Sequence, residues 1–254
     1  MPTVFASSGD SVVEKSVSTF IGGASWSTNV RGSATTAGNS QDSTLTNYDF
    51  GVWNGKFVGR GTANAWKLNR SFFPFDSSGA TLSGNTVASA DLKVYVDNLG
   101  GTSNQEKRIY AVKSAALADS TADYGNVFSS GTTLRTTYGQ ADISTTAGYH
   151  TFTLTSDAIT DINSAISAGN TLTIGLLGFY DYGNSDPGTS NETKIQVYYS
   201  EDSSGIAGTS NDPKLELTYV VTGFGHKTIG VASANIGKIN GVATANVGKV
   251  IGVD

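Results

Sequence analysis

Short segments in which apolar and polar residues alternate do most to limit the folds open to this chain. In ASADLKVYVDN, Leu92, Val94 and Val96 alternate with more polar neighbours, and Leu215 and Leu217 do the same in PKLELTYVV. A period of two residues places one face of a β-strand in a core and the other toward solvent. At least seven strand-like segments, divided by turn-rich stretches, predict a two-sheet β-sandwich.

Two segments depart from this alternation. TLTIGLLGFY is continuously apolar, which predicts a central strand covered on both faces. SDAITDINSAISAG instead carries apolar residues at helical spacing, with Ser156 as the expected N-cap and Gly169 as the expected end. We expect a short helix that closes one end of the sandwich. Asp157 and Asp161 lie on its opposite face, where we expect solvent.

A tight turn is predicted within VWNGKFVGRG. Asn54-Gly55 stands between apolar flanks, and such a pair is typical of the two-residue loop of a β-hairpin. The sequence therefore predicts that the chain reverses at this point and that the residues on either side pair with each other.

Composition limits the classes of function that the chain can serve. The 254 residues include 31 Gly but no Cys, and only 15% are charged, with a net charge of -5. The lack of Cys excludes disulfides, thiolate zinc sites and cysteine nucleophiles. An acidic chain also lacks the clustered Lys and Arg that binding to nucleic acid requires.

Length and hydropathy predict one domain followed by a tail. We expect a jelly-roll-like sandwich over residues 1–221 and a Gly-rich repeat tail over 222–254. No stretch is apolar for the roughly 18 residues that a membrane helix needs, and the start resembles no secretory signal peptide. We therefore expect no membrane partner and a location on a virion surface or outside a cell, reached by a route such as lysis.

The order of four segments resembles the DNRLRE-type jelly-roll modules, which look like carbohydrate-binding modules. The segments are Arg70-Ser71-Phe72, Ala90-Asp91-Leu92-Lys93-Val94-Tyr95, Phe152-Thr153-Leu154-Thr155 and Pro213-Lys214-Leu215-Glu216-Leu217-Thr218-Tyr219. The resemblance covers roughly residues 65 to 220. It implies a jelly roll of the kind found in bacterial surface proteins and predicted phage structural proteins, which are usually non-catalytic. The family often has Trp near the third segment, where this chain has Tyr149-His150.

The end of the chain repeats itself every 11 residues. The repeating columns are Lys227, Lys238 and Lys249, then Gly230, Gly241 and Gly252, then Val231, Val242 and Val253. Such a period can mark a helical supercoil, but a Gly in each unit costs a helix about 1 kcal/mol. Short strands with turns near the glycines fit better, and the tail resembles the I-x-K-x-N-G-V-A repeats of predicted phage structural proteins.

Repeats this short cannot bury a face alone, so we expect other subunits to complete it. The partners would be further copies of the chain, as a homotrimer or larger assembly, or other virion proteins. The alternative is a disordered extension. The candidate assembly residues are Val231, Ile236, Ile239, Val242, Val247, Val250 and Val253.

The segment FYDYGNSDPG is the main candidate for ligand binding. Tyr180 and Tyr182 would share a face if the preceding strand continued, and could then stack on a glycan. Asp181, Asn184 and Asp186 could supply oxygen ligands to calcium, the one cofactor considered. The alternative is an aromatic strand end followed by an Asp-Pro-Gly turn.

Other aromatic and acid-base residues give weaker indications. Trp53 is a third candidate for glycan contact, although a Trp in a sandwich is more often partly buried. Catalysis of the Ser-His-Asp type would need His150 or His226; His150 has the parity of Phe152, which predicts packing at a strand end. Nothing in the spacing pairs the loop carboxylates for glycoside hydrolysis, namely Asp181, Asp186, Glu192 and Glu201.

These indications predict a protein that is not an enzyme. We expect a structural or appendage protein of a virion, such as a phage capsid decoration protein or fibre, that displays a sandwich and assembles through its tail. The alternative is a carbohydrate-binding module or adhesin of a cell surface. A glycoside hydrolase is the third class.

Overall fold

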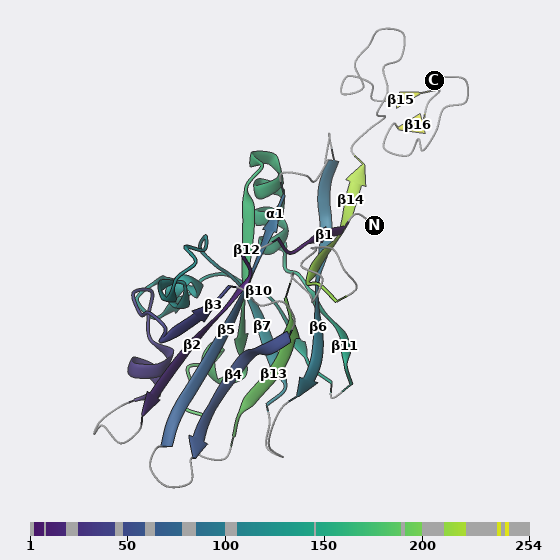
Figure 1. Ribbon diagram of the computed structural model, residues 1–254. Helices are drawn as coiled ribbons and strands as arrows, with labels where there is room; N and C mark the ends of the chain where they lie inside the picture. Colours follow the sequence, from purple (N-terminus) through teal and green to yellow (C-terminus); the bar gives the residue numbers. More distant parts are fainter. Residues whose placement is uncertain are drawn as a thin grey trace.

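The computed structural model presents a folded body and a separate C-terminal hairpin (Figure 1). The structure describes residues 3–7, 9–18, 25–43, 48–58, 64–77, 85–99, 106–144, 146–188, 191–199, 211–221, 238–239 and 242–243.

One antiparallel sheet of twelve strands forms the body (Figure 1). Its main path runs β1-β14-β6-β13-β4-β5-β12-β7-β10, while β11 pairs with β6 and β2 joins β5 to β3. The strands are β1 (Thr3–Phe5), β2 (Ser11–Ser18), β3 (Ser40–Asp42), β4 (Tyr48–Val58), β5 (Asn64–Asp76), β6 (Asn85–Leu99), β7 (Arg108–Lys113), β10 (Thr137–Asp142), β11 (Gly148–Thr153), β12 (Thr171–Gly178), β13 (Thr193–Tyr198) and β14 (Lys214–Val221).

The sheet forks along β5. β4 pairs with residues 64–69 of β5, and β12 pairs with residues 71–76. β2 pairs with residues 65–72 of β5, which includes residues that also pair with β4 and residues that also pair with β12. β2 therefore occupies one edge of β5, and β4 and β12 share its opposite edge. The two arms of the sheet therefore separate near Arg70.

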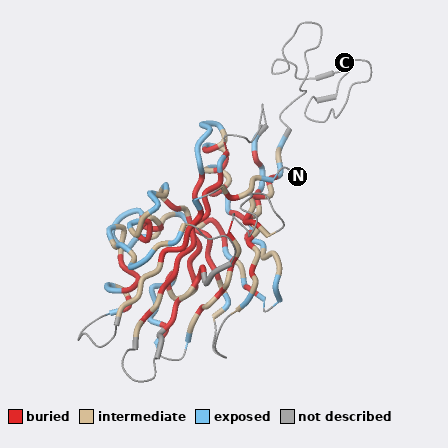
Figure 2. The backbone as a smooth tube through the Cα atoms, in the orientation of Figure 1, coloured by how far each residue is buried: buried red, intermediate tan, exposed pale blue. Residues whose placement is uncertain are grey.

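The arms fold over each other and enclose an inner core (Figure 2). Val94 and Leu217 come from one arm, and Phe73, Ile109 and Ile174 come from the other. Since both arms contribute side chains to one cluster, the protein is a β-sandwich, as the alternating segments predict. All pairings in the twelve-stranded sheet are antiparallel.

A second, outer core lies on the other face of β2, β5, β7 and β12. Its cover consists of short elements, and it encloses Trp66, Leu68 and Tyr124. The covering elements are the π-helix η1 (Trp26–Arg31), the 3-10 helix η2 (Thr121–Val127), β8 (Phe128–Ser130) and β9 (Thr133–Leu134). β12 lies between the two cores, which confirms that this apolar strand is covered on both faces.

Helix α1 (Ser156–Ala168) closes one end of the inner core through Ala158, Ile162 and Ala165. Gly169 ends it in the left-handed region at φ 64°, as predicted. The N-cap is Thr155 rather than Ser156, because the Thr155 hydroxyl accepts from the Ala158 amide.

The structure differs from the sequence predictions in two ways: its described residues include three further short helices, and a predicted turn is part of a strand instead. η1, η2 and α2 (Phe179–Tyr182) are each a few residues long, too short for a periodic signal. The hairpin predicted at Asn54-Gly55 is wrong, since both residues continue through β4. None of the helices among the described residues has the length and apolarity needed to cross a membrane.

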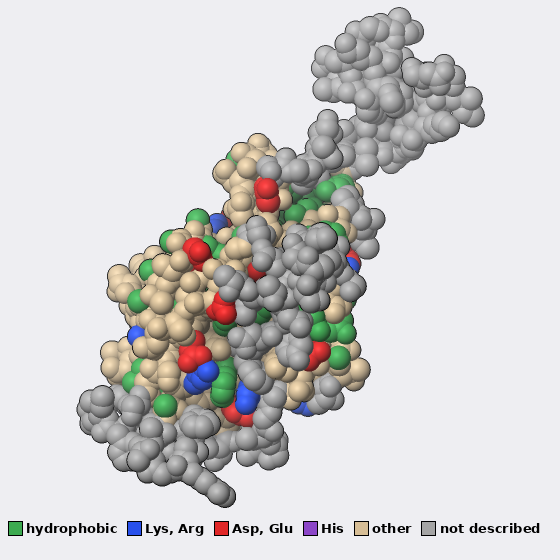
Figure 3. Space-filling view, viewed as in Figure 1, with side chains coloured by type: hydrophobic (Ala, Val, Ile, Leu, Met, Phe, Trp, Pro, Cys, Tyr) green, Lys and Arg blue, Asp and Glu red, His purple; other side chains and the backbone are tan. Residues whose placement is uncertain are grey.

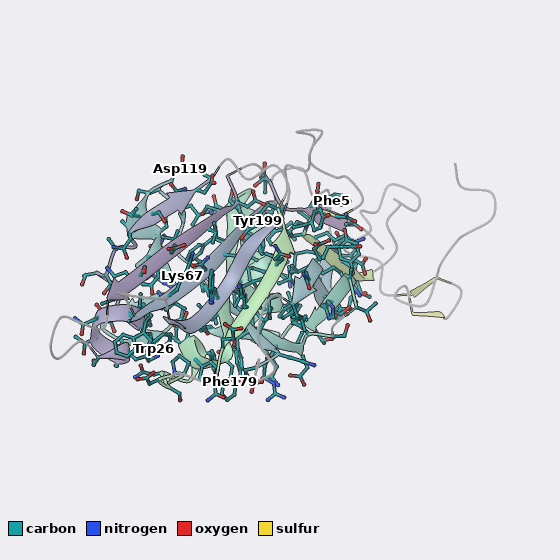
Figure 4. All side chains as sticks on the ribbon, turned by 60° about the horizontal axis from the view of Figure 1, so that its bottom comes forward. Phe5, Trp26, Lys67, Asp119, Phe179 and Tyr199 are labelled. Atoms are coloured by element: carbon teal, nitrogen blue, oxygen red, sulfur yellow. The ribbon has the colours of Figure 1, made fainter. Side chains whose placement is uncertain are left out.

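Two short strands belong to the tail. β15 (Lys238–Ile239) and β16 (Val242–Ala243) pair antiparallel, with Ile239 opposite Val242. This agrees with short strands on either side of Asn240-Gly241. The pair lies outside the sandwich in two views (Figures 1 and 4).

Candidate functional site

A buried ion pair occupies the fork of the sheet. The Arg70 guanidinium donates from Nε to Asp181 Oδ2 and from Nη2 to Oδ1, both at 2.7 Å, and both side chains are fully buried. Asn54 Oδ1 accepts from the Asp181 amide at 3.1 Å. A Cβ at Gly178 would collide with the Asn54 amide, so Gly allows the end of β12 to approach β4 here.

Arg31 adds a second cation beside the same carboxylate. Its Nε donates to the Asp181 carbonyl at 2.6 Å and lies 3.6 Å from the carboxylate. Burial lowers the pKa of Arg31, although Asp181 opposes the shift. Burial also works against the charge of Arg70, but Asp181 and Tyr124 raise its pKa overall. Arg70 is therefore charged, and its bonds to Asp181 lie wholly inside the fold.

This ion pair corrects the calcium candidate. Both oxygens of Asp181 accept from Arg70 inside the protein, so they are not available to an ion in the exposed loop. Asn184 and Asp186 are exposed, and Asp186 Oδ1 accepts from the Gly188 amide at 2.8 Å. The loop thus contains the alternative Asp-Pro-Gly turn. The described residues contain no cluster of three or more His, Asp or Glu that could hold a metal.

The two tyrosines of this loop do not share a strand face, because residues 179–182 form the helical turn α2. Tyr180 packs edge-on against Phe179, with 5.3 Å between ring centroids. Tyr182 instead stacks flat on Tyr110, at 3.7 Å and an interplanar angle of 5°. Its hydroxyl lies 3.0 Å from Thr137 Oγ1. Only Tyr182 thus presents a fixed aromatic plane.

Polar residues that sequence reasoning missed lie on β7 and β10 next to Tyr110, the inner ring of this stack. Gln140 on β10 lies directly opposite Tyr110 in register and is exposed. Two residues along, Arg108 donates to Asp142 at 2.7 and 3.1 Å. Tyr110, Gln140, Arg108, Asp142 and Tyr182 together form what we call the Tyr182 patch. No sequence signal joins β7, β10 and α2, which only the fold brings together.

Trp53 lies on the other arm of the sheet and is half-buried. The ammonium groups of Lys67 and Lys194 lie 4.3 and 4.5 Å from its ring centroid. Lys67 also contacts Glu14 at 2.6 Å. The Trp53 ring is thus in contact with two lysines, which makes Trp53 a weaker surface for sugar stacking than Tyr182. Trp26 and Trp66 are buried.

Two shallow grooves with mixed polar and apolar linings lie near the end closed by α1. Their volumes are about 350 and 390 Å³, and they share Ala116, Thr171 and Thr173. Asp161 lines the first and is not simply solvated, since it accepts from Lys113 at 2.8 Å and from Tyr138 at 2.6 Å. Burial would raise the pKa of Asp161, but these two hydrogen bonds outweigh it and lower the pKa.

The grooves and the aromatic loop belong to different parts of the surface. Asp119, which lines the second groove, and Phe179 of the loop lie on opposite sides of the sandwich (Figure 4). Acidic and basic side chains are interspersed on the face shown in Figure 3. Neither observation gives the grooves a preferred ligand.

The candidates for catalysis are dispersed. His150 is half-buried opposite Val94, and burial lowers its pKa, in keeping with packing near a strand end. Asp181 is held by Arg70, and Glu192 lies beside β13. His226 and Glu201 lie outside the described residues.

Of the candidate assembly residues, Ile239 and Val242 lie opposite each other in the β15–β16 pair. The others lie outside the described residues, namely Val231, Ile236, Val247, Val250 and Val253. No protein-family model matches the chain, and a search of curated proteins finds no match to it. Its function is therefore inferred from its own geometry.

Proposed function

We propose that the chain is a non-catalytic structural or appendage protein of a virion, of the decoration or fibre type, that assembles through its C-terminal repeats and displays the β-sandwich. The observation that carries this proposal is the β15–β16 pair in the middle repeat unit. It pairs the two residues that precede Asn240 with the two that follow Gly241.

The size of the pair argues for a partner. Each strand has two residues, and an isolated two-stranded hairpin is at best marginally stable in water. The Gly and Val columns recur 11 residues apart, so one chain can supply up to three such units. Strands of neighbouring copies would complete the ladder and cover the valines.

The sandwich supports a display role. Arg70 and Asp181 pair inside the protein at the fork, which suits a stable domain that is displayed. The family resemblance in the sequence agrees with a displayed jelly roll, since such modules occur in predicted phage structural proteins.

Light scattering of the full chain over a range of concentrations tests the assembly role. We expect a trimer or larger species for the full chain. The double variant Ile239→Asp, Val242→Asp should be monomeric, because it places charges where a shared apolar ladder must form. Ser89→Asp, an exposed position on β6, is the matched control and should assemble normally.

Circular dichroism decides how a monomeric variant is interpreted. An unchanged β spectrum and unfolding midpoint would show that the sandwich folds without assembly. A full chain that stays monomeric at every concentration would contradict self-assembly. Strong self-assembly of the double variant would show that other residues carry it.

A further inference from the structure

The Tyr182 patch has a geometry that the assembly role does not use. Tyr110 belongs to β7 and is only 8% exposed, and the Tyr182 ring covers it in parallel. The inner face of the Tyr182 ring is thus occupied. Tyr182 as a whole is half-buried, so solvent reaches part of the surface that Tyr110 does not cover.

The position of this ring is fixed. The Tyr182 hydroxyl bonds Thr137, and the adjacent Asp181 is locked by Arg70. A ring supported on one face and bonded at its hydroxyl loses little freedom when a ligand stacks on the other face.

A second cluster of aromatic rings on the sandwich is packed differently from the Tyr110–Tyr182 stack. Tyr95 packs edge-to-face against Tyr149 and Tyr198, with interplanar angles of 84° and 81°. In each such pair the edge of one ring lies against the face of the other. None of these pairs is stacked in parallel as Tyr110 and Tyr182 are, so the cluster serves as an internal comparison.

The polar groups of the Tyr182 patch suit hydroxyl groups. The Gln140 amide can donate and accept, and the Asp142 carboxylate, whose side chain is 67% exposed, can accept from adjacent hydroxyls while Arg108 donates. The Arg108–Asp142 pair carries no net charge. A planar apolar ring in a patch of donors and acceptors that carries no net charge matches a neutral sugar, whose C–H face is apolar and whose rim carries hydroxyls.

We infer that the Tyr182 patch is a binding site for a neutral pyranose residue of a glycan. The sugar ring stacks on the outer face of Tyr182, and its hydroxyls bond Gln140 and the Arg108–Asp142 pair. This role is separate from assembly through the tail, and either can fail without the other.

Titration of the full chain with soluble neutral oligosaccharides tests the site. The probes are gluco-, manno-, galacto- and chito-oligosaccharides of about four to six units, followed by calorimetry and by tyrosine fluorescence. We expect at least one to bind, and expect Tyr182→Ala to weaken it by about tenfold or more, as for a central aromatic contact. Gln140→Ala, at an exposed position, should weaken it several-fold without affecting folding.

Two variants separate binding from structure. Tyr182→Phe keeps the stack and loses only the bond to Thr137, so it should retain affinity. Tyr95→Ala removes a comparable ring from the other aromatic cluster and should also bind normally. Loss of affinity in Tyr95→Ala but not in Tyr182→Ala would place the site elsewhere. No binding by any oligosaccharide at about 10 mM, the range of very weak complexes, would overturn the inference.

Discussion

The two cores on either side of β5, β7 and β12 are closed in different ways. The inner core lies between two arms of sheet, whose backbone groups are paired in the ladders. The outer core is covered by short helices and turns, whose carbonyls must find other donors. Arg70 donates to the carbonyls of Tyr124 and Arg31, and Arg31 donates to those of Asp181 and Thr132.

The comparison teaches why two arginines are buried beside the outer core. A guanidinium carries five N–H donors, so two arginines can satisfy several carbonyls of an irregular cover at once. Asp181 then offsets part of their charge. Tyr124 also satisfies a carbonyl of the irregular cover, because its hydroxyl donates to the Val30 carbonyl at 2.6 Å.

The largest expected effect comes from Asp181→Asn, which tests whether the two buried arginines need an anion beside them. The amide keeps the shape of the side chain but leaves two buried guanidinium groups without an anion, which should cost about 3 to 5 kcal/mol in the free energy of unfolding. Urea unfolding followed by tryptophan fluorescence measures this, since Trp26 and Trp66 lie in the outer core. Asp142→Asn breaks the exposed pair with Arg108 and should leave the midpoint unchanged. Similar midpoints for both variants would contradict a special role for the buried pair.

Leu176 and Leu177 allow the two cores to be probed at adjacent positions. Both are fully buried on β12, with Leu176 in the inner core and Leu177 in the outer core. Truncation of either to Ala should cost about 2 to 5 kcal/mol. Hydrogen exchange should distinguish them, because Leu177→Ala should expose amides of η1 and η2 first. Equal protection changes in both variants would mean that the cores unfold as one unit.

Sequence patterns predicted the regular parts of the inner core well. The alternation through Leu92, Val94 and Val96 gave a strand facing that core, and the continuous apolar run gave β12. Helix α1 followed from its spacing and from Gly169. These features are local, since a few neighbouring residues decide them.

The outer core and the fork could not be predicted in this way. Asn54-Gly55 has the composition of a turn, but Asn54 is buried in β4 and bonds the Asp181 amide, a contact 127 residues away. The loop position of Asp181 suggested exposed calcium chemistry, whereas Arg70, 111 residues away, holds it inside. Long-range contacts override local turn and charge signals at both positions.

The cap of α1 gives a smaller effect that belongs to the inner core. Thr155→Ala should lower the free energy of unfolding by about 1 kcal/mol, the usual value of an N-cap hydroxyl. Ser156→Ala is the matched control, since Ser156 is exposed at the first helical position and should change little. Denaturant unfolding of both measures the difference. A larger loss in Ser156→Ala would mean that the helix begins one residue later.

The smallest expected effect is a pH dependence at the rim of the inner core. His150 lies on β11 opposite Val94, and burial holds its pKa below the usual value of about 6.5. The unfolded chain then binds a proton more readily than the folded one, so this residue should reduce stability as the pH falls through about 6.5. His150→Gln should remove that part of the pH dependence and leave stability above about pH 7.5 little changed. Unfolding midpoints of both proteins between about pH 5.5 and 8, above the range in which carboxylates titrate, measure this pH dependence.

Parallel curves of midpoint against pH would mean that His150 is as hydrated in the folded protein as in the unfolded chain. A difference confined to low pH would show that the apolar inner core senses protonation at its rim.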